Sequence, residues 1–226
     1  MSKALKYVFI PLLALLLALQ LRESVGIVKA IFFPTPPMTV SGNLDMYLWT
    51  AVGAVAYTLL RGLLRKNIVW LETFSHELTH IVVSLMPFRK IHSFRAGQGS
   101  GEVTTSGSDV SRVFVSLAPY CLPIFTYLLL FFRPLIKADS LYVYDILVGI
   151  SIAFHAICFK TQTGNHQPDI NRFPLFFSYL YIAAALLFNL NTILVSYWSS
   201  KNVFTAFVYS LQSMWEGTTS FISLIT

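Results

Sequence analysis

The chain has 226 residues, of which 55% are hydrophobic and only 12% are charged. Soluble domains carry about 25% charged residues, so this composition, with a mean hydropathy of +0.65, excludes an ordinary soluble domain and indicates an integral membrane protein. The net charge is +6, but the basic residues are scattered at the ends of apolar runs, where they indicate membrane topology rather than a nucleic-acid-binding patch.

The first apolar runs predict a pair of membrane helices. Tyr7–Leu21 resembles a secretory signal, but Arg22 and Glu23 stand directly before the small residues that would suit cleavage, so we expect a retained membrane helix. The proline-rich segment Glu23–Asn43 predicts an extended connection, and Met46–Leu64 predicts the second span. Basic residues at both ends of this pair place the N-terminus in the cytoplasm of a multi-pass protein.

The segment Asn67–Pro87 carries the sharpest functional signal, the sequence HELTH at His76–His80. Two histidines four residues apart lie on one face of a helix, where both imidazoles can bind a single zinc ion. Glu77 lies beside them, where it could take a proton from a metal-activated water. We expect Asn67 to cap this helix and Pro87 to end it.

The alternative interpretation of this motif is a helix with two solvated or core histidines and an incidental glutamate. The spacing also predicts an apolar stripe, formed by Phe74, Leu78, Ile81 and Leu85, away from the histidines. Ionisable groups in or beside a membrane cost free energy unless they have a function. Because the motif lies among apolar segments, we favour the zinc site.

A polar stretch, Phe88–Ser111, follows the motif helix. Within it Glu102–Thr105 is rich in β-prone residues and bracketed by glycines, which suits either a hairpin strand or a flexible loop. Val113–Phe132 then predicts a third span with Pro119 and Pro123 inside it.

Two further spans are predicted, Tyr142–Phe159 and Phe173–Tyr197, and they enclose the dense polar segment Lys160–Arg172. The first of them carries two ionisable groups, Asp145 and His155. The apolar spacing beyond Lys201 predicts an interfacial helix. The two cysteines lie in apolar spans and are expected to be buried free thiols; they are Cys121 and Cys158.

The predicted fold is therefore an all-α polytopic membrane protein, a bundle of about five to six transmembrane helices with a small Gly-rich β-prone segment after the motif helix. We expect one integral membrane domain over residues 1–226. It would comprise an N-terminal helical hairpin (1–66), a metallopeptidase-like core (67–200) and an interfacial C-terminal helix (201–226).

Taken together, the residues of Asn67–Phe177 resemble the site-2 protease family of intramembrane zinc metallopeptidases, and within it the small, divergent bacterial members. The resemblance is carried by the His76–His80 helix, by the Gly-rich segment Gly97–Gly107 and by the pattern Asn165-x-x-Pro168-Asp169. It implies a Zn²⁺-dependent endopeptidase of the bacterial cytoplasmic membrane whose substrates are membrane-embedded or membrane-adjacent polypeptides.

The sequence departs from the family pattern at two places. Thr79 stands where the family usually has Gly or Ala, and Ile170, not Gly, follows Asp169. Neither change removes a ligand, but both bear on the assignment of Asp169 and of the substrate.

The third zinc ligand is left open by the residues themselves. Asp169, His155 and His166 can each be brought to the histidine pair, and the resemblance favours Asp169. Glu72 lies on the motif helix, and three ligands in line fit tetrahedral zinc badly, so we expect it to orient a histidine instead. Two groups in the polar stretch are expected at the surface, His92 and Asp109.

Two other functions remain open, a membrane metal-ion or proton transporter and an inactive protease-like scaffold.

The membrane topology decides whether Asp169 can reach the histidine pair. If Asn67–Pro87 crosses the bilayer fully, Asp169 lies on the opposite face from His76, whereas a segment that dips and returns lets the ligands meet. We expect the return.

Overall fold

The computed structural model describes residues 3–32, 41–86, 90–97, 101–106, 109–198 and 202–223. The long helices are α1 (Lys3–Phe32), α2 (Ser41–Leu63), α3 (Arg65–Leu85), α6 (Leu141–Gln162), α8 (Leu175–Trp198) and α9 (Val203–Ser223). The shorter elements are β1 (Lys90–Ala96), β2 (Gly101–Ser106), α4 (Asp109–Leu117), α5 (Ile124–Phe132) and α7 (Pro168–Asn171), with 3-10 turns η1 (Ala118–Tyr120), η2 (Arg133–Leu135) and η3 (Ala138–Ser140).

Within these described ranges, three helices are long and apolar enough to cross a membrane, and the number rises to five if each of two bent helix pairs forms one span. The three lie in Phe9–Ala30, Ala138–Gln162 and Leu175–Trp198. The predicted all-α polytopic class is therefore confirmed. The described residues contain at most five candidate spans, and about five to six were predicted.

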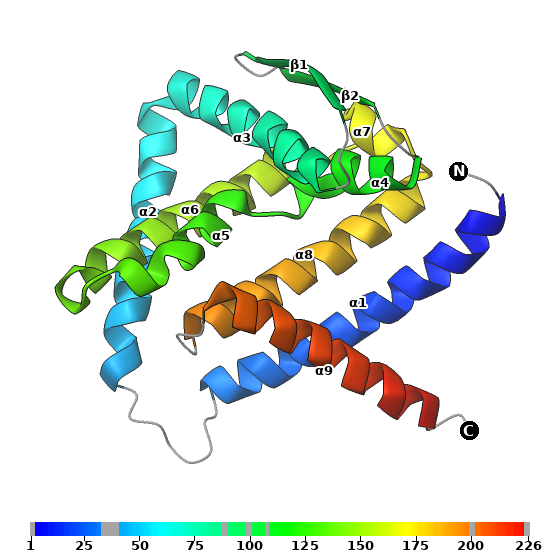
Figure 1. Ribbon diagram of the computed structural model, residues 1–226. Coiled ribbons are helices and arrows are strands. Elements are labelled where there is room, and N and C mark those ends of the chain that lie inside the picture. The colour runs from blue at the N-terminus through cyan, green and yellow to red at the C-terminus, as the bar shows by residue number, and fades with distance from the viewer. Residues whose placement is uncertain are drawn as a thin grey trace.

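The helices pack as two groups that meet at α8 (Figure 1). In one group α2 lies against α6, and in the other α1 and α9 lie against α8. The α2–α6 contact is backbone to backbone, because a Cβ on Gly53 would collide with the Ile146 carbonyl and a Cβ on Gly149 with the Thr50 carbonyl. Small residues permit this approach between apolar helices, where packing replaces the hydrophobic effect.

The first helix is longer than predicted, since α1 continues to Phe32 where an extended connection from Glu23 was expected. Buried polar contacts with α8 hold this extra length: Asn191 donates to the carbonyl and the side-chain oxygen of Gln20, and Ser24 donates to Asn191. The expectation was therefore wrong over residues 23–32, and the proline cluster at residues 34–37 lies outside the described residues.

Helix α3 turns 115° away from α2 and does not extend it as a straight span (Figure 1). A partly buried ion pair joins the two arms, with Arg61 Nε 2.6 Å from Glu72 Oε1, and the Tyr57 hydroxyl donates to the same oxygen at 3.1 Å. A bend of this size occurs in a broken span as well as in a re-entrant segment, so the return of residues 67–87 stays a prediction. The helix begins at Arg65 after Leu64 without a side-chain cap, so the cap predicted at Asn67 is wrong.

Burial on α3 is inverted relative to a soluble helix. Its buried positions are mostly polar, whereas Val82 and Leu85 are exposed. The polar face that carries the motif is turned into the protein and the apolar face outward, which suits a helix bordered by lipid.

The predicted span Val113–Phe132 is two helices, because α4 and α5 meet at an angle of 84°. The break falls at Pro119 and Pro123, where proline cannot donate to the helix and disfavours helical backbone before it. The two prolines that the sequence analysis placed inside this span are thus where the helix breaks. The break has a structural result: η1 carries Tyr120 against the motif helix.

The β-prone segment forms a strand, as one of the two interpretations expected. β2 pairs antiparallel with β1, with Val103 opposite Phe94 and Gly101 opposite Ala96. The hairpin lies along α3, where Phe94 contacts Phe74 edge to face. It thus covers the helix that carries the motif.

Candidate metal centre

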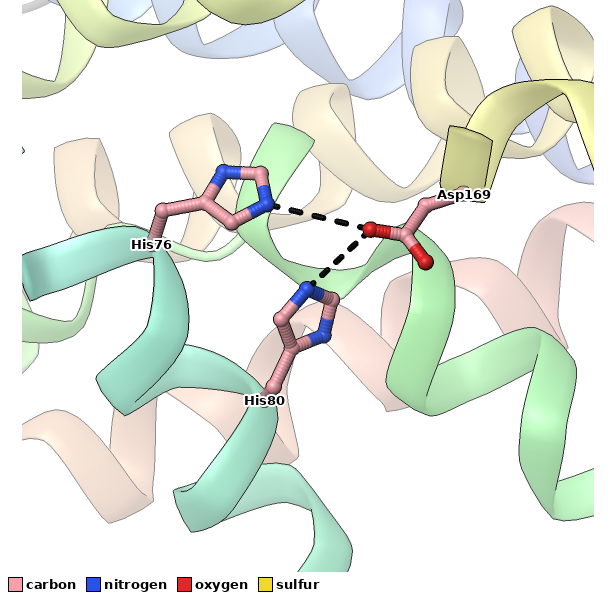
Figure 2. A group of neighbouring side chains, drawn as sticks. All are labelled: His76, His80 and Asp169. Atoms are coloured by element: carbon pink, nitrogen blue, oxygen red, sulfur yellow. Dashed lines mark ion pairs between the residues drawn. The ribbon is translucent and has the colours of Figure 1, made fainter. Parts of the chain in front are cut away.

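Three side chains from two distant parts of the chain converge on one point (Figure 2). His76 and His80 come from α3 and Asp169 comes from α7. Asp169 Oδ2 lies 3.9 Å from His76 Nε2 and 3.3 Å from His80 Nε2. Among the residues that the structure describes, this is the group of three metal-ligating side chains whose ligand atoms all lie within 4.8 Å of one another.

The other ring nitrogen of each histidine is occupied by an acceptor. His80 Nδ1 lies 2.8 Å from the Val115 carbonyl oxygen, and His76 Nδ1 lies 3.1 Å from Gln162 Oε1. A carbonyl only accepts, so each Nδ1 carries the proton and each Nε2 keeps a free lone pair directed at Asp169. This tautomer is the one that binds a metal through Nε2, so the residues present fit a zinc ion.

Asp169 is held in place by its neighbour in sequence. Ile170 is fully buried against Leu117, Tyr120 and Ile182, and its carbonyl accepts a hydrogen bond from Ser178. Pro168 begins the short helix that carries Asp169.

Glu77 is buried beside the group and does not belong to it. A Cβ on Gly101 would collide with the Glu77 carboxylate, so the absence of a side chain there lets β2 lie directly over this residue. Glu77 lines a cavity of about 660 Å³ together with His80, Asp169 and residues 101–104 of β2. The carboxylate therefore stands between the metal-ligating group and the strand.

The rival ligands lie elsewhere. His155 lines a small cavity that His76 also lines, but it does not join the cluster. His166 is exposed, and its ring lies close to Gly164. Asp145 accepts a hydrogen bond from Tyr197. His92 contacts Ser106 on the exposed hairpin, as expected of a surface residue; the side chain of Asp109 lies outside the described part.

The expectation that Glu72 orients a histidine was wrong. Its carboxylate is taken by Arg61 and Tyr57, and Gln162 stands beside His76 instead. Gln162 is the last residue of α6, and only its place in a polar segment could have drawn attention to it. The Val115 carbonyl belongs to the backbone and has no sequence signal at all.

The two residues that depart from the family pattern, Thr79 and Ile170, both make ordinary contacts within the fold. The Thr79 hydroxyl donates to the Ser75 carbonyl on its own helix and adds no polar group to the site. Ile170 serves as the core anchor described above. Both cysteines are free and buried, as expected.

A family model described as Peptidase M50B-like matches residues 48–163, just over half of the chain. The chain belongs to this family. Comparisons with curated proteins and with solved structures gave no match. Family membership confirms the resemblance to site-2 proteases, and together with the apolar helices it makes this chain an integral membrane protein of a peptidase family. The matched region contains His76, Glu77 and His80 and ends before Asp169.

Proposed function

We propose that this protein is a zinc-dependent endopeptidase that cleaves membrane-embedded or membrane-adjacent polypeptides. One observation carries the proposal: both motif histidines direct Nε2 at the same oxygen of Asp169 while an acceptor occupies each Nδ1. Family membership supports the peptidase class independently of this geometry.

In this proposal His76, His80 and Asp169 hold Zn²⁺. Zinc bound by three protein ligands keeps one position for water, lowers the pKa of that water toward about 7 and polarises a carbonyl placed beside it. Gln162 and Val115 keep the imidazoles in the ligating tautomer. Glu77 accepts the proton of the attacking water and passes it to the leaving amine.

The cavity beside Glu77 suits an extended substrate. Residues 101–104 of β2 form one wall, and Pro168, Asp169 and Arg172 form another. A transmembrane helix hides its own carbonyls, so a substrate must unwind before cleavage, and β2 could hold the extended segment through main-chain hydrogen bonds.

The transporter alternative finds less support. An ion path would use several of the membrane-depth ionisable groups, but Asp145 is bonded to Tyr197 between α6 and α8, and His155 stands apart from the cluster. The basic residues around the first two helices and the resemblance to bacterial enzymes support a further proposal, that the protein lies in the bacterial cytoplasmic membrane with its N-terminus inside.

Two variants test the function. Glu77→Gln is expected to abolish cleavage of a membrane-anchored reporter, with a loss of at least about 100-fold, while zinc measured on the purified protein stays near one per chain. His80→Ala is expected to lose both zinc and activity. Near-normal cleavage by Glu77→Gln would refute the mechanism. Loss of zinc from it would make Glu77 a ligand, and a wild-type protein that binds zinc without cleaving any membrane polypeptide would indicate a scaffold.

A further inference from the structure

A second cavity, of about 410 Å³, lies among α1, α8 and α9, apart from the metal centre. Its lining includes Ala30 and Trp198, which are the last residues of the candidate spans Phe9–Ala30 and Leu175–Trp198. The ring of Tyr47 contacts that of Trp198 in a tilted arrangement, with the ring centroids 4.9 Å apart. Tryptophan and tyrosine gather where spans leave the hydrocarbon, so the end of the cavity at Ala30 and Trp198 lies at the level of lipid headgroups, and Glu23 lies seven residues deeper along α1.

Glu23 is the unusual residue of this cavity. Its side chain lines the cavity although the residue is only 9% exposed. Neither carboxylate oxygen has a hydrogen-bond partner of normal geometry among the described residues. The Ser210 hydroxyl faces it from α9 but could satisfy only one of about four acceptor positions. A buried carboxylate in this state calls for a cationic hydrogen-bond donor.

The rest of the lining specifies which cation fits. Two exposed charged residues also line the cavity: Arg22, next to Glu23 in sequence, supplies the opposite charge, and Glu216 of α9 supplies a second carboxylate. Leu19, Ile27 and Leu194 supply apolar wall. A negative group buried beside an exposed positive one, above an apolar wall, matches a molecule with an ammonium, a phosphate and an acyl chain.

We propose that this cavity binds a phospholipid with a primary ammonium headgroup, of the phosphatidylethanolamine type. The ammonium donates to the Glu23 carboxylate, the phosphate lies at the Arg22 guanidinium, and the acyl chains follow the apolar wall. The volume is within the range of about 300–1,000 Å³ that is usual for ligand sites. All the lining residues lie in α1, α8 and α9, outside the matched residues 48–163, so the site belongs to the part of this chain that the family model does not cover.

Binding of short-chain phosphatidylethanolamine and phosphatidylcholine to the purified full-length protein, measured by native mass spectrometry, tests the proposal. The trimethylated ammonium of phosphatidylcholine cannot donate a hydrogen bond, so the wild type should bind phosphatidylethanolamine about tenfold more tightly or better. Glu23→Gln should abolish this preference. Arg22→Gln, at an exposed position, should weaken both lipids and leave their ratio unchanged. Asp45→Asn removes an exposed carboxylate near the start of α2 and serves as the matched control, with no expected effect.

Equal affinity of the wild type for the two lipids would overturn the proposal, as would a preference that survives in Glu23→Gln. The latter result would make Glu23 a buried, neutral core residue. Soluble phosphoethanolamine distinguishes the source of the ammonium: binding as tight as that of the lipid would show a site for a free amine and refute a lipid site. If Glu23→Gln fails to fold, the wild-type ratio and Arg22→Gln still decide the question.

Discussion

His76 and His80 lie one helical turn apart, yet their second ring nitrogens are held by different means. A backbone carbonyl holds His80, and the Gln162 side chain holds His76. The Gln162 contact can therefore be removed by mutation. Loss of an outer hydrogen bond to a ligating histidine commonly weakens metal binding about 10- to 100-fold.

We predict that Gln162→Ala lowers zinc affinity by about 10- to 100-fold and leaves folding intact, as measured by competition with a chromophoric chelator. Thr161→Ala is the control, because that hydroxyl donates only to carbonyls of its own helix. Equal zinc affinity in Gln162→Ala and wild type would show that this hydrogen bond does not orient His76.

The third ligand is a separate question at the same scale. Zinc content measured side by side for Asp169→Ala, His155→Ala and His166→Ala should fall only in the Asp169 variant, since its carboxylate alone of the three reaches both histidines. Full zinc occupancy in Asp169→Ala, with loss in either histidine variant, would show that the assignment is wrong.

At the scale of single elements, β2 combines two properties. Its first residue lies against Glu77, and residues 101–104 line the cavity. In a two-stranded sheet β2 pairs with β1 on one side only, which leaves main-chain groups along its other side for a substrate. The strand is thus placed where an extended polypeptide would meet the metal centre.

If β2 holds substrate, Val103→Pro should impair cleavage by about tenfold or more, because proline removes a main-chain donor and distorts the strand. Zinc content and the unfolding temperature should stay near those of the wild type, since the hairpin lies outside the helical bundle. Val103→Thr keeps the N–H group and a branched side chain and is expected to remain active. Undiminished turnover by Val103→Pro would show that β2 does not hold the substrate and that the hairpin only covers α3.

At the scale of the whole molecule, α2 and α6 approach each other backbone to backbone at two glycines. A methyl group at Gly149 would meet the Thr50 carbonyl, which belongs to the backbone and cannot move aside alone. We predict that Gly149→Ala lowers stability in detergent by about 1–3 kcal/mol, measured by thermal or denaturant unfolding. Gly62→Ala, at a helical glycine with open space around it, should be neutral or slightly stabilising. Equal unfolding of the two variants would exclude a close packed contact at Gly149.

The residue pattern alone determined the membrane class, the motif helix and the family resemblance. Composition sufficed for the class because burial in lipid demands apolar surface along whole helices. Spacing sufficed for the motif because helical periodicity brings His76 and His80 to one face over four residues. The β-prone segment was also visible, since glycines and β-branched residues favour a hairpin through local backbone preferences.

Tertiary structure alone decided the bends, the extent of α1 and the surroundings of the metal-ligating group. Glu23–Phe32 became helical because α8 supplies buried partners such as Asn191, which no local pattern shows. Glu72 pairs with Arg61 because the 115° bend brings α2 and α3 together there. Gln162 contacts His76 because α6 ends beside the motif helix. Asp169 reached the histidines across 89 or more positions of chain because Ile170 is anchored in the core. These contacts join residues far apart in sequence, and their formation depends on how helices pack rather than on the preference of any one segment.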